Sequence, residues 1–158
     1  TPGIGSTFVI TLPFEKAEET DISSEPESER NSIQGIKILL AEDNELNAEI
    51  AKTLLSDEGA NLTVAEDGLQ AVRMFQEKPE GYFDAILMDI MMPVMDGLTA
   101  TKTIRSLKHP DAETIPIIAM TANAFQEDAE KCIAAGMNAH LAKPLDIEKV
   151  KMTIYKYI

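Results

Sequence analysis

One stretch decides how the whole chain is interpreted, and it reads Phe83-Asp84-Ala85-Ile86-Leu87-Met88-Asp89-Ile90-Met91-Met92-Pro93. Its apolar run is short and ends at Met88, a pattern typical of a strand buried on both faces of a parallel sheet. Asp89 follows where we expect the strand to end, and Pro93 limits further strand pairing. Ligands of open α/β sheets bind at the carboxyl ends of strands. Asp89 is therefore a candidate for chemistry, although on its own a loop-capping role explains it equally well.

The segment from Gly35 to Ile158 alternates strand and helix patterns five times. Strands are predicted at 36–41, 62–65, 83–88, 115–120 and 139–142. Apolar residues at helical spacing follow each of them, beginning with Leu46, Ile50 and Leu54. Such units predict an α/β fold of the flavodoxin-like, doubly wound kind. We expect a five-stranded parallel sheet in the order 2-1-3-4-5 with helices on both faces.

Two other segments precede this region. Residues 1–14 carry no charge, and their glycines lead into an alternating apolar run that predicts a strand without a hairpin partner. Residues 15–34 contain seven acidic residues against Lys16 and Arg30 and almost nothing apolar. They cannot bury enough surface to offset the entropy of ordering. We interpret 15–34 as a solvated linker, with an acidic docking tail as the less favoured alternative.

Charge and composition restrict the partners of the chain. Its 158 residues carry a formal net charge of −13, which disfavours nucleic acid and anionic membranes as direct partners. Cys132 is the only cysteine, so an internal disulfide is excluded and a reducing compartment is the simpler expectation. No apolar run has the length of a membrane span. We therefore expect a soluble, cytoplasmic domain.

Polar residues stand directly after four of the five predicted strands: Glu42, Asp43, Asp89, Thr121 and Lys143. In the order 2-1-3-4-5 the first and third strands are neighbours, so the three carboxylates share one crevice. Two charges 4 Å apart repel by about 4 kcal/mol at an effective dielectric of about 20. Either one carboxylate holds a proton or a cation binds, and hard oxygen ligands suit Mg²⁺ completed by a phosphate. With the lysine and the hydroxyl, these are the parts of an aspartyl-phosphate site.

The same residues lie in blocks that resemble those of a response-regulator receiver domain. The variant is the one found in hybrid sensor histidine kinases of two-component phosphorelays, and the resemblance covers Gly35 to Ile158. The blocks are Leu39-Leu40-Ala41-Glu42-Asp43-Asn44, Met88-Asp89-Ile90-Met91-Met92-Pro93-Val94-Met95-Asp96-Gly97, Ala119-Met120-Thr121-Ala122-Asn123-Ala124 and Leu141-Ala142-Lys143-Pro144. The segment from Gly3 to Pro13 also resembles the final glycine box and last strand of the kinase ATP-binding domain.

The resemblance implies that Asp89 is the phosphoacceptor, which attacks a phosphohistidine. It further implies that Asp43 and Asp89 hold Mg²⁺ directly, with Mn²⁺ as an alternative ion. Glu42 would act through water, and the backbone carbonyl of Met91 would complete the ligand set. The domain would assist its own phosphorylation and dephosphorylation without being an enzyme in the ordinary sense.

The remaining implied roles concern Lys143, Thr121 and His140. Lys143 would stabilise developing charge on the phosphoryl group, and Thr121 would move toward a phosphoryl oxygen. The Lys143–Pro144 peptide is expected to be cis. His140 stands where the family usually carries Tyr or Phe as a rotating switch. An imidazole there either makes the switch weaker or pH-dependent or is an ordinary half-exposed strand residue, and both readings stay open.

The resemblance implies a histidine kinase core as donor and a histidine phosphotransfer protein or downstream regulator as recipient. One alternative is a docking module of the same fold that takes no phosphate, which the complete acidic pocket disfavours. A phosphohydrolase is another, but it would need a second acid at position 91, where Met91 stands. We also expect His109 to be solvated, Cys132 to pack on the sheet, and the loop methionines Met91, Met92 and Met95 to pack locally.

Overall fold

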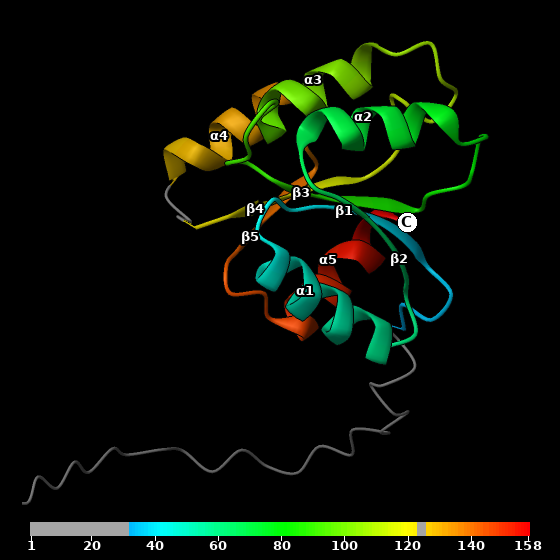
Figure 1. Cartoon of the computed structure of the whole chain (residues 1–158), viewed down its shortest axis with the longest axis vertical. Coiled ribbons are helices and arrows are strands. Elements are labelled where there is room, and N and C mark those ends of the chain that lie inside the picture. The colour runs from blue at the N-terminus through cyan, green and yellow to red at the C-terminus, as the bar shows by residue number, and fades with distance from the viewer. Residues whose placement is uncertain (1–31, 123–125) are drawn as a thin grey trace, which may run out of the picture.

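A computed structural model describes residues 32–122 and 126–158 (Figure 1). Its centre is a sheet of five parallel strands in the order β2-β1-β3-β4-β5. The strands are β1 (Lys37–Ala41), β2 (Asn61–Ala65), β3 (Ala85–Asp89), β4 (Ile117–Thr121) and β5 (Ala139–Ala142). This topology confirms the predicted flavodoxin-like fold, in which β1 and β3 are neighbours.

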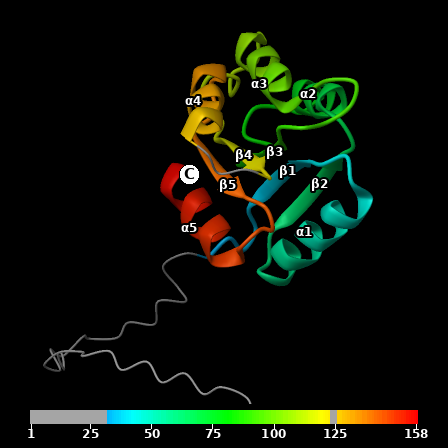
Figure 2. The same cartoon turned by 90° about the vertical axis from the view of Figure 1, so that its left-hand side faces the viewer.

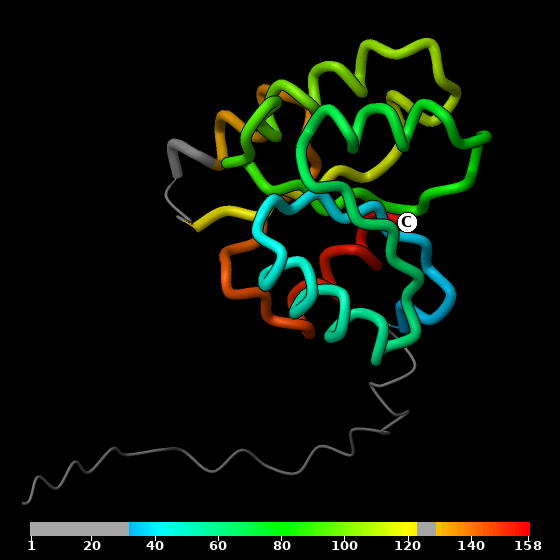
Figure 3. Tube along the Cα trace, viewed as in Figure 1, coloured from blue at the N-terminus to red at the C-terminus, as the bar shows by residue number. Residues whose placement is uncertain are grey.

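Helices α1 and α5 cover one face of the sheet, and α2, α3 and α4 cover the other (Figures 1 and 2). The helices are α1 (Glu45–Asp57), α2 (Gly68–Glu77), α3 (Gly97–Ser106), α4 (Gln126–Ala135) and α5 (Ile147–Tyr157). Each face has its own core: Phe75 and Ile104 belong to the core under α2–α4, and Leu55 and Val150 to the core under α1 and α5. The trace in Figure 3 shows the two layers with the sheet between them.

Strand β3 lies at the centre of the sheet, and all five of its residues are buried. Ile86 and Met88 contribute to one core and Leu87 to the other, which explains the uninterrupted apolar run. Asp89 is the last residue of the strand and not the first residue after it, and it lies opposite Met120 of β4. The backbone of the candidate nucleophile is thus fixed by the sheet.

Strand β4 begins at Ile117, two residues later than predicted. Pro116 has no N–H group to donate to the ladder, so it cannot be an ordinary residue of a central strand. Its carbonyl oxygen still accepts a hydrogen bond from the Ile86 N–H at 2.8 Å. The predicted start of the strand at Ile115 was therefore wrong, because Pro116 has no N–H group with which to extend the ladder.

Helix α1 is present as predicted, but the residues that indicated it do not face the core. Leu46 and Ile50 are 68% and 50% exposed, and Leu54 is also exposed. The residues that α1 buries are Ala48, Ala51 and Leu55. Two of the three buried residues are alanines, which allow the helix to lie close to the sheet, and Leu46, Ile50 and Leu54 are turned outward.

Short polar side chains begin four of the helices. Each accepts a hydrogen bond from a backbone N–H of the first turn, and the four are Asn44, Asp67, Asp96 and Asp146. Gly136 ends α4: its φ of 101° is unfavourable for other residues, and its N–H donates to the Ile133 carbonyl oxygen. Local sequence signals therefore account for the starts of these four helices and for the end of α4.

His109, in the loop between α3 and β4, is half buried, which corrects the prediction that it is solvated. Its ring packs on Phe75 with the ring centroids 4.6 Å apart. Its Nε2 lies 2.9 Å from the Lys78 carbonyl oxygen, and its Nδ1 accepts from the Asp111 N–H at 3.2 Å. Because Nδ1 accepts, Nε2 is the ring nitrogen that donates to the Lys78 carbonyl oxygen. His109 therefore joins two loops at the amino ends of the strands.

The packed part of the chain includes Ile33, which is fully buried in the core under α1 and α5. It lies two positions before the predicted domain boundary at Gly35. The predicted kinase remnant at 1–14 and all but the last residues of the predicted linker lie outside the described residues. Cys132 is buried, as predicted. Within 32–122 and 126–158, no helix combines the length and apolar character that crossing a membrane requires.

Candidate functional site

The candidate site lies at the carboxyl edge of the sheet, where the predicted residues come together. Glu42 and Asp43 follow β1, and Asp89 ends the adjacent β3. One carboxylate oxygen from each of these three residues lies within 4.8 Å of the other two. Glu42 and Asp89 are buried, whereas Asp43 is exposed to solvent. The site thus has a fixed acidic floor and one acidic residue at its mouth.

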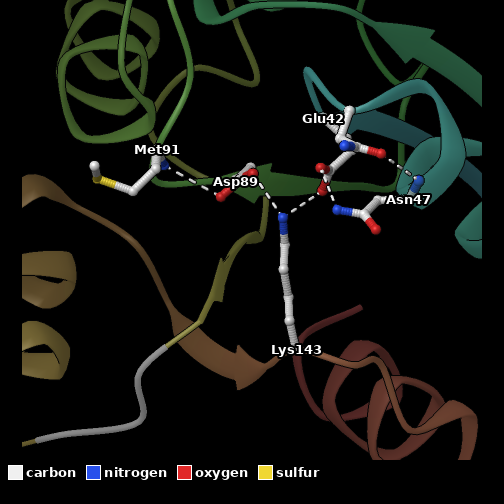
Figure 4. Close-up of polar contacts among 6 residues, drawn as sticks. Glu42, Asn47, Asp89, Met91 and Lys143 are labelled. Carbon is white, nitrogen blue, oxygen red and sulfur yellow. Dashed lines mark hydrogen bonds and ion pairs between the residues drawn. The ribbon is translucent and has the colours of Figure 1, made fainter.

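Lys143, directly after β5, reaches across the site to two of the carboxylates (Figure 4). Its Nζ donates to Glu42 Oε2 at 2.5 Å and to Asp89 Oδ2 at 2.6 Å. Desolvation lowers the pKa of this ammonium, but the hydrogen bonds and charges of Asp89 and Glu42 outweigh that effect and raise it. Lys143 is therefore a permanent cation at neutral pH. The peptide bond between Lys143 and Pro144 is cis, as predicted.

Backbone and side-chain donors hold the two buried carboxylates in place. The Asn47 side-chain amide donates to Glu42 Oε1 at 3.1 Å, and the Met91 N–H donates to Asp89 Oδ1 at 3.2 Å (Figure 4). Asn47 was missed by the sequence reasoning. It lies three residues after the helix cap Asn44, whose side chain accepts from the Asn47 N–H at 3.0 Å. That spacing could have indicated that the Asn47 side chain lies near the carboxyl end of β1.

Thr121 and His140 differ in their relation to the site. Thr121 is buried at the end of β4, and its side chain lines the same cavity as Asp89. Its carbonyl oxygen accepts a hydrogen bond from the Lys143 N–H at 2.8 Å. His140 lies on β5 opposite Ala119 and is exposed. The structure therefore brings Thr121 to the candidate nucleophile and leaves His140 on the surface.

The cavity between Asp89, Thr121 and Lys143 has a volume of about 540 Å³. The charged groups that line it within the described residues are Glu42, Asp43, Asp89 and Lys143, so three carboxylates face one ammonium and two negative charges are in excess. A hard divalent cation with oxygen ligands and retained waters matches this donor set and this charge. The arrangement can hold such a cation beside a carboxylate nucleophile.

Comparison with known proteins gives an independent view of the chain. A family model for the response regulator receiver domain matches residues 38–155. The chain is 36% identical over 151 residues to a probable histidine kinase 1 from Oryza sativa subsp. indica, covering 77% of this chain and 15% of the rice protein. It is 41% identical over 138 residues to two-component system protein A of Emericella nidulans, covering 86% of this chain and 20% of that protein. The chain thus spans a fifth or less of the length of these two relatives.

Two solved structures of similar fold are likewise described as receiver domains. The receiver domain of a Pseudomonas aeruginosa sensor histidine kinase, described with magnesium coordinated in its active-site cleft, has a TM-score of 0.70 and 41% identity. That match covers 78% of this chain and 97% of the other. The receiver domain of Saccharomyces cerevisiae Ssk1, crystallised with the histidine phosphotransfer protein Ypd1, has a TM-score of 0.68 and 28% identity. It covers 79% of this chain and 90% of the other.

Proposed function

The chain belongs to the response regulator receiver domain family, and on this basis we propose that Asp89 accepts a phosphoryl group from a phosphohistidine in a two-component phosphorelay. The observation that carries the proposal is that Lys143 Nζ contacts the Asp89 carboxylate at 2.6 Å inside a cavity with excess negative charge. A nucleophile, an anion-binding ammonium and a cation-binding acidic cluster are together the parts that phosphoryl transfer to a carboxylate needs.

In the proposed reaction, a carboxylate oxygen of Asp89 attacks phosphorus and forms a new O–P bond. The P–N bond of the phosphohistidine breaks, and its electron pair leaves with the imidazole, which takes a proton from solvent. Lys143 is already positioned to meet the charge on the phosphoryl oxygens, so little reorganisation is needed. The Thr121 hydroxyl supplies a second donor. The group then passes to another histidine, or water attacks phosphorus and releases inorganic phosphate, which regenerates the carboxylate.

The residues present fit Mg²⁺, with Mn²⁺ as the alternative ion. We assign Asp43 and Asp89 as direct ligands, Glu42 as a ligand through water, and the Met91 backbone carbonyl as a further ligand. The short separation of the three carboxylates and the magnesium described for the Pseudomonas receiver domain support this assignment. When bound, the ion supplies positive charge against the acidic cluster and the phosphoryl oxygens. Asp89 remains within the sheet, so the nucleophile keeps its position.

The proposal includes the surroundings of the domain. We infer that it is the receiver segment of a longer hybrid histidine kinase, with 1–14 as the remnant of the ATP-binding domain, 15–34 as the linker and 35–158 as the receiver. The relatives named as histidine kinases support this inference. The donor would be the kinase core, and the recipient a histidine phosphotransfer protein such as the one found with Ssk1. We place the domain in the cytoplasm, where ATP supplies the phosphoryl group.

The test uses acetyl phosphate as a small phosphodonor. The protein is incubated with acetyl phosphate and Mg²⁺, and intact-mass and peptide spectrometry locate the added phosphoryl group. We expect one phosphoryl group on Asp89, and we expect it to disappear when Mg²⁺ is chelated. Asp89→Asn should remove the labelling because the amide is a poor nucleophile.

Two controls separate this function from its alternatives. Asp84→Asn changes an acid outside the cavity, whose carboxylate accepts from the Lys37 N–H at 2.7 Å, and labelling should persist. Absence of labelling in the wild type would refute the proposal and favour a docking module that takes no phosphate. Continuous hydrolysis of unrelated phosphoesters would instead indicate a phosphohydrolase.

A further inference from the structure

The loop between β3 and α3 contains a strained turn at Val94. The Met95 N–H donates to the Pro93 carbonyl oxygen at 2.6 Å, and Val94 between them has a φ of 65°. A three-residue turn of this hand is rare and strained. For a β-branched residue a positive φ is a genuine outlier, and Val94 is the only residue other than glycine with positive φ in the described part of the chain. Strain of this kind persists at functional sites when the surrounding structure enforces it.

Neighbouring elements enforce the turn from both sides. The Gly68 N–H donates to the Met95 carbonyl oxygen at 3.1 Å, and the Gly97 N–H donates to the Ile90 carbonyl oxygen at 3.0 Å. A Cβ atom on Gly68 would overlap the Met95 carbonyl oxygen, so α2 approaches the loop closely. The backbone of the loop is therefore wedged between β3 and α2, and the turn cannot relax independently.

The Val94 side chain gains no burial in return. Val94 is 79% exposed and Met91 is 80% exposed, and Pro93 between them is also exposed. Met91 was predicted to pack within the loop, and this was wrong, whereas Met92 does pack in the core. Met91, Pro93 and Val94 form an apolar surface that we call the loop rim. Val94 is therefore unfavourable for the folded domain in two ways: its backbone is strained, and its apolar side chain is exposed to solvent.

The loop rim stands between two polar hollows. Met91 lines the cavity of Asp89 and Lys143. Pro93 lines a groove of about 660 Å³ on the other side, beside α1 and the loop after β2. That groove is lined by six carboxylates against the single ammonium of Lys52, and the acids are Glu42, Asp43, Glu45, Glu49, Glu66 and Asp67. A protein that covers the loop rim would therefore meet strong negative charge beside it.

We propose that Val94 is a docking contact for the protein that exchanges its phosphoryl group with Asp89. This inference rests on the proposed function, because a histidine side chain can reach the cavity only if the surface around it covers the loop rim. The matching surface is apolar beside the histidine and carries Lys or Arg residues toward the acidic groove. A small phosphodonor enters the cavity without touching Val94. Val94 therefore acts on protein donors alone.

The experiment compares two kinds of donor on four proteins. The donors are acetyl phosphate and a panel of purified, phosphorylated histidine phosphotransfer proteins that begins with yeast Ypd1. The proteins are the wild type, Val94→Thr, Val94→Asn and Met152→Gln. Threonine keeps the shape and the strain of valine but adds a hydroxyl, whereas asparagine tolerates positive φ and is polar. Met152 is an exposed apolar residue on α5 and serves as the matched surface control.

We expect both Val94 variants to slow transfer from any protein donor that labels the wild type by about 10-fold, the effect of losing one substantial interface contact. Their labelling by acetyl phosphate should equal that of the wild type, and Met152→Gln should match the wild type with both donors. Val94→Asn should raise Tm because it relieves strain, and Val94→Thr should not, so loss of transfer in both cannot be attributed to stability.

Three results would overturn the inference. Wild-type transfer rates in Val94→Thr would show that the strain matters and the apolar contact does not. Equal slowing with acetyl phosphate would show that the loop acts on the cavity itself. Labelling of the wild type by acetyl phosphate but by no protein of the panel would show that the loop rim is not a docking contact for this class of donor. Failure of acetyl phosphate as well would instead refute the proposed function.

Discussion

Polar networks join the loops at both edges of the sheet, but one binds its cation with neutral acceptors and the other with an excess of carboxylates. At the amino edge Arg105 Nε and Nη1 donate to the carbonyl oxygens of Gly136 and Ala112 at 2.9 and 2.8 Å, and its Nη2 donates to Asn138 Oδ1 at 3.0 Å. The same Asn138 oxygen accepts from the Ile117 N–H at 2.9 Å. At the carboxyl edge three carboxylates instead converge on one ammonium.

This difference indicates that the amino edge contributes to stability and that the carboxyl edge is arranged for chemistry. In the described part of the chain no buried side-chain nitrogen or oxygen lacks a hydrogen-bond partner, so both edges are satisfied as hydrogen-bond networks. The amino edge uses one cation and neutral acceptors that the fold itself supplies. The carboxyl edge keeps two negative charges in excess, which is unfavourable until a cation binds. Such locally unfavourable arrangements are expected where a protein performs its function.

The largest expected effect on stability comes from breaking the amino edge with Arg105→Met. The carbonyl oxygens of Gly136 and Ala112 lose the Arg105 donor, while Asn138 Oδ1 keeps the Ile117 N–H. We expect the free energy of unfolding to fall by about 3 kcal/mol, since each buried unsatisfied group costs about 1–3 kcal/mol before relaxation. Burial lowers the pKa of Arg105, yet the guanidinium stays charged at neutral pH. Urea denaturation measures the loss, and Asp89 labelling by acetyl phosphate should not change while the variant is folded.

Arg105→Lys serves as the matched control. An ammonium keeps the charge but cannot reach three acceptors in the geometry of a guanidinium, so only part of the stability should return. Reduced labelling in either folded variant would contradict the separation of the two edges.

The next effect comes from Lys143→Met at the carboxyl edge. This change leaves the buried carboxylates of Glu42 and Asp89 without their shared cation, which commonly costs about 3–5 kcal/mol for a fully buried pair. Lys143 is partly exposed, so we expect a loss of about 2 kcal/mol without Mg²⁺. Added Mg²⁺ should raise Tm more in the variant than in the wild type, because the ion replaces the missing charge. Labelling of Asp89 should fall sharply.

Lys149→Met is the control for Lys143→Met. Lys149 belongs to an exposed pair with Asp146 at 3.6 Å, so the change should alter neither Tm nor its response to Mg²⁺. If Mg²⁺ stabilised Lys143→Met no more than the wild type, the acidic cluster would not be the site where the ion binds.

The sequence predicts the fold well because both of its main signals are local. The apolar run of β3 and the caps Asn44 and Asp96 act within a few residues, and they place the strands and helices in the observed order. The side of α1 that faces the sheet was not predictable in the same way. Ala48 and Ala51 are weak apolar signals, and only close packing against the sheet explains why they are buried and Leu46 is not.

The convergence of the site was predictable because strand order alone brings Glu42, Asp43 and Asp89 together. What the sequence could not supply was side-chain direction. That Lys143 joins two of these carboxylates depends on rotamers chosen in the folded chain. The network of His109 also depends on loops that are distant in sequence, so its half-buried position carried no local signal.

The smallest predicted effect concerns Asp96, which caps α3 near the carboxyl edge but bonds only within its own helix. The backbone N–H and the hydroxyl of Thr99 hold the pKa of Asp96 below its ordinary value of 3.8. A lowered pKa in the folded state adds stability that is present above the unfolded value and is lost as pH falls through the folded value. Asp96→Asn keeps a good cap but does not titrate.

The wild type should therefore lose stability relative to Asp96→Asn as pH falls below about 4, by less than about 1 kcal/mol because the carboxylate is exposed and screened. Thermal unfolding between pH 3 and pH 7 measures the difference. Asp89 labelling at pH 7 should be the same in both proteins, since Asp96 lies outside the cavity. Identical acid sensitivity of the two proteins would mean that the carboxylate is not bound to the first turn of α3. Altered labelling would mean that the cap also orients the loop of the nucleophile, so that stability and chemistry are coupled at this edge.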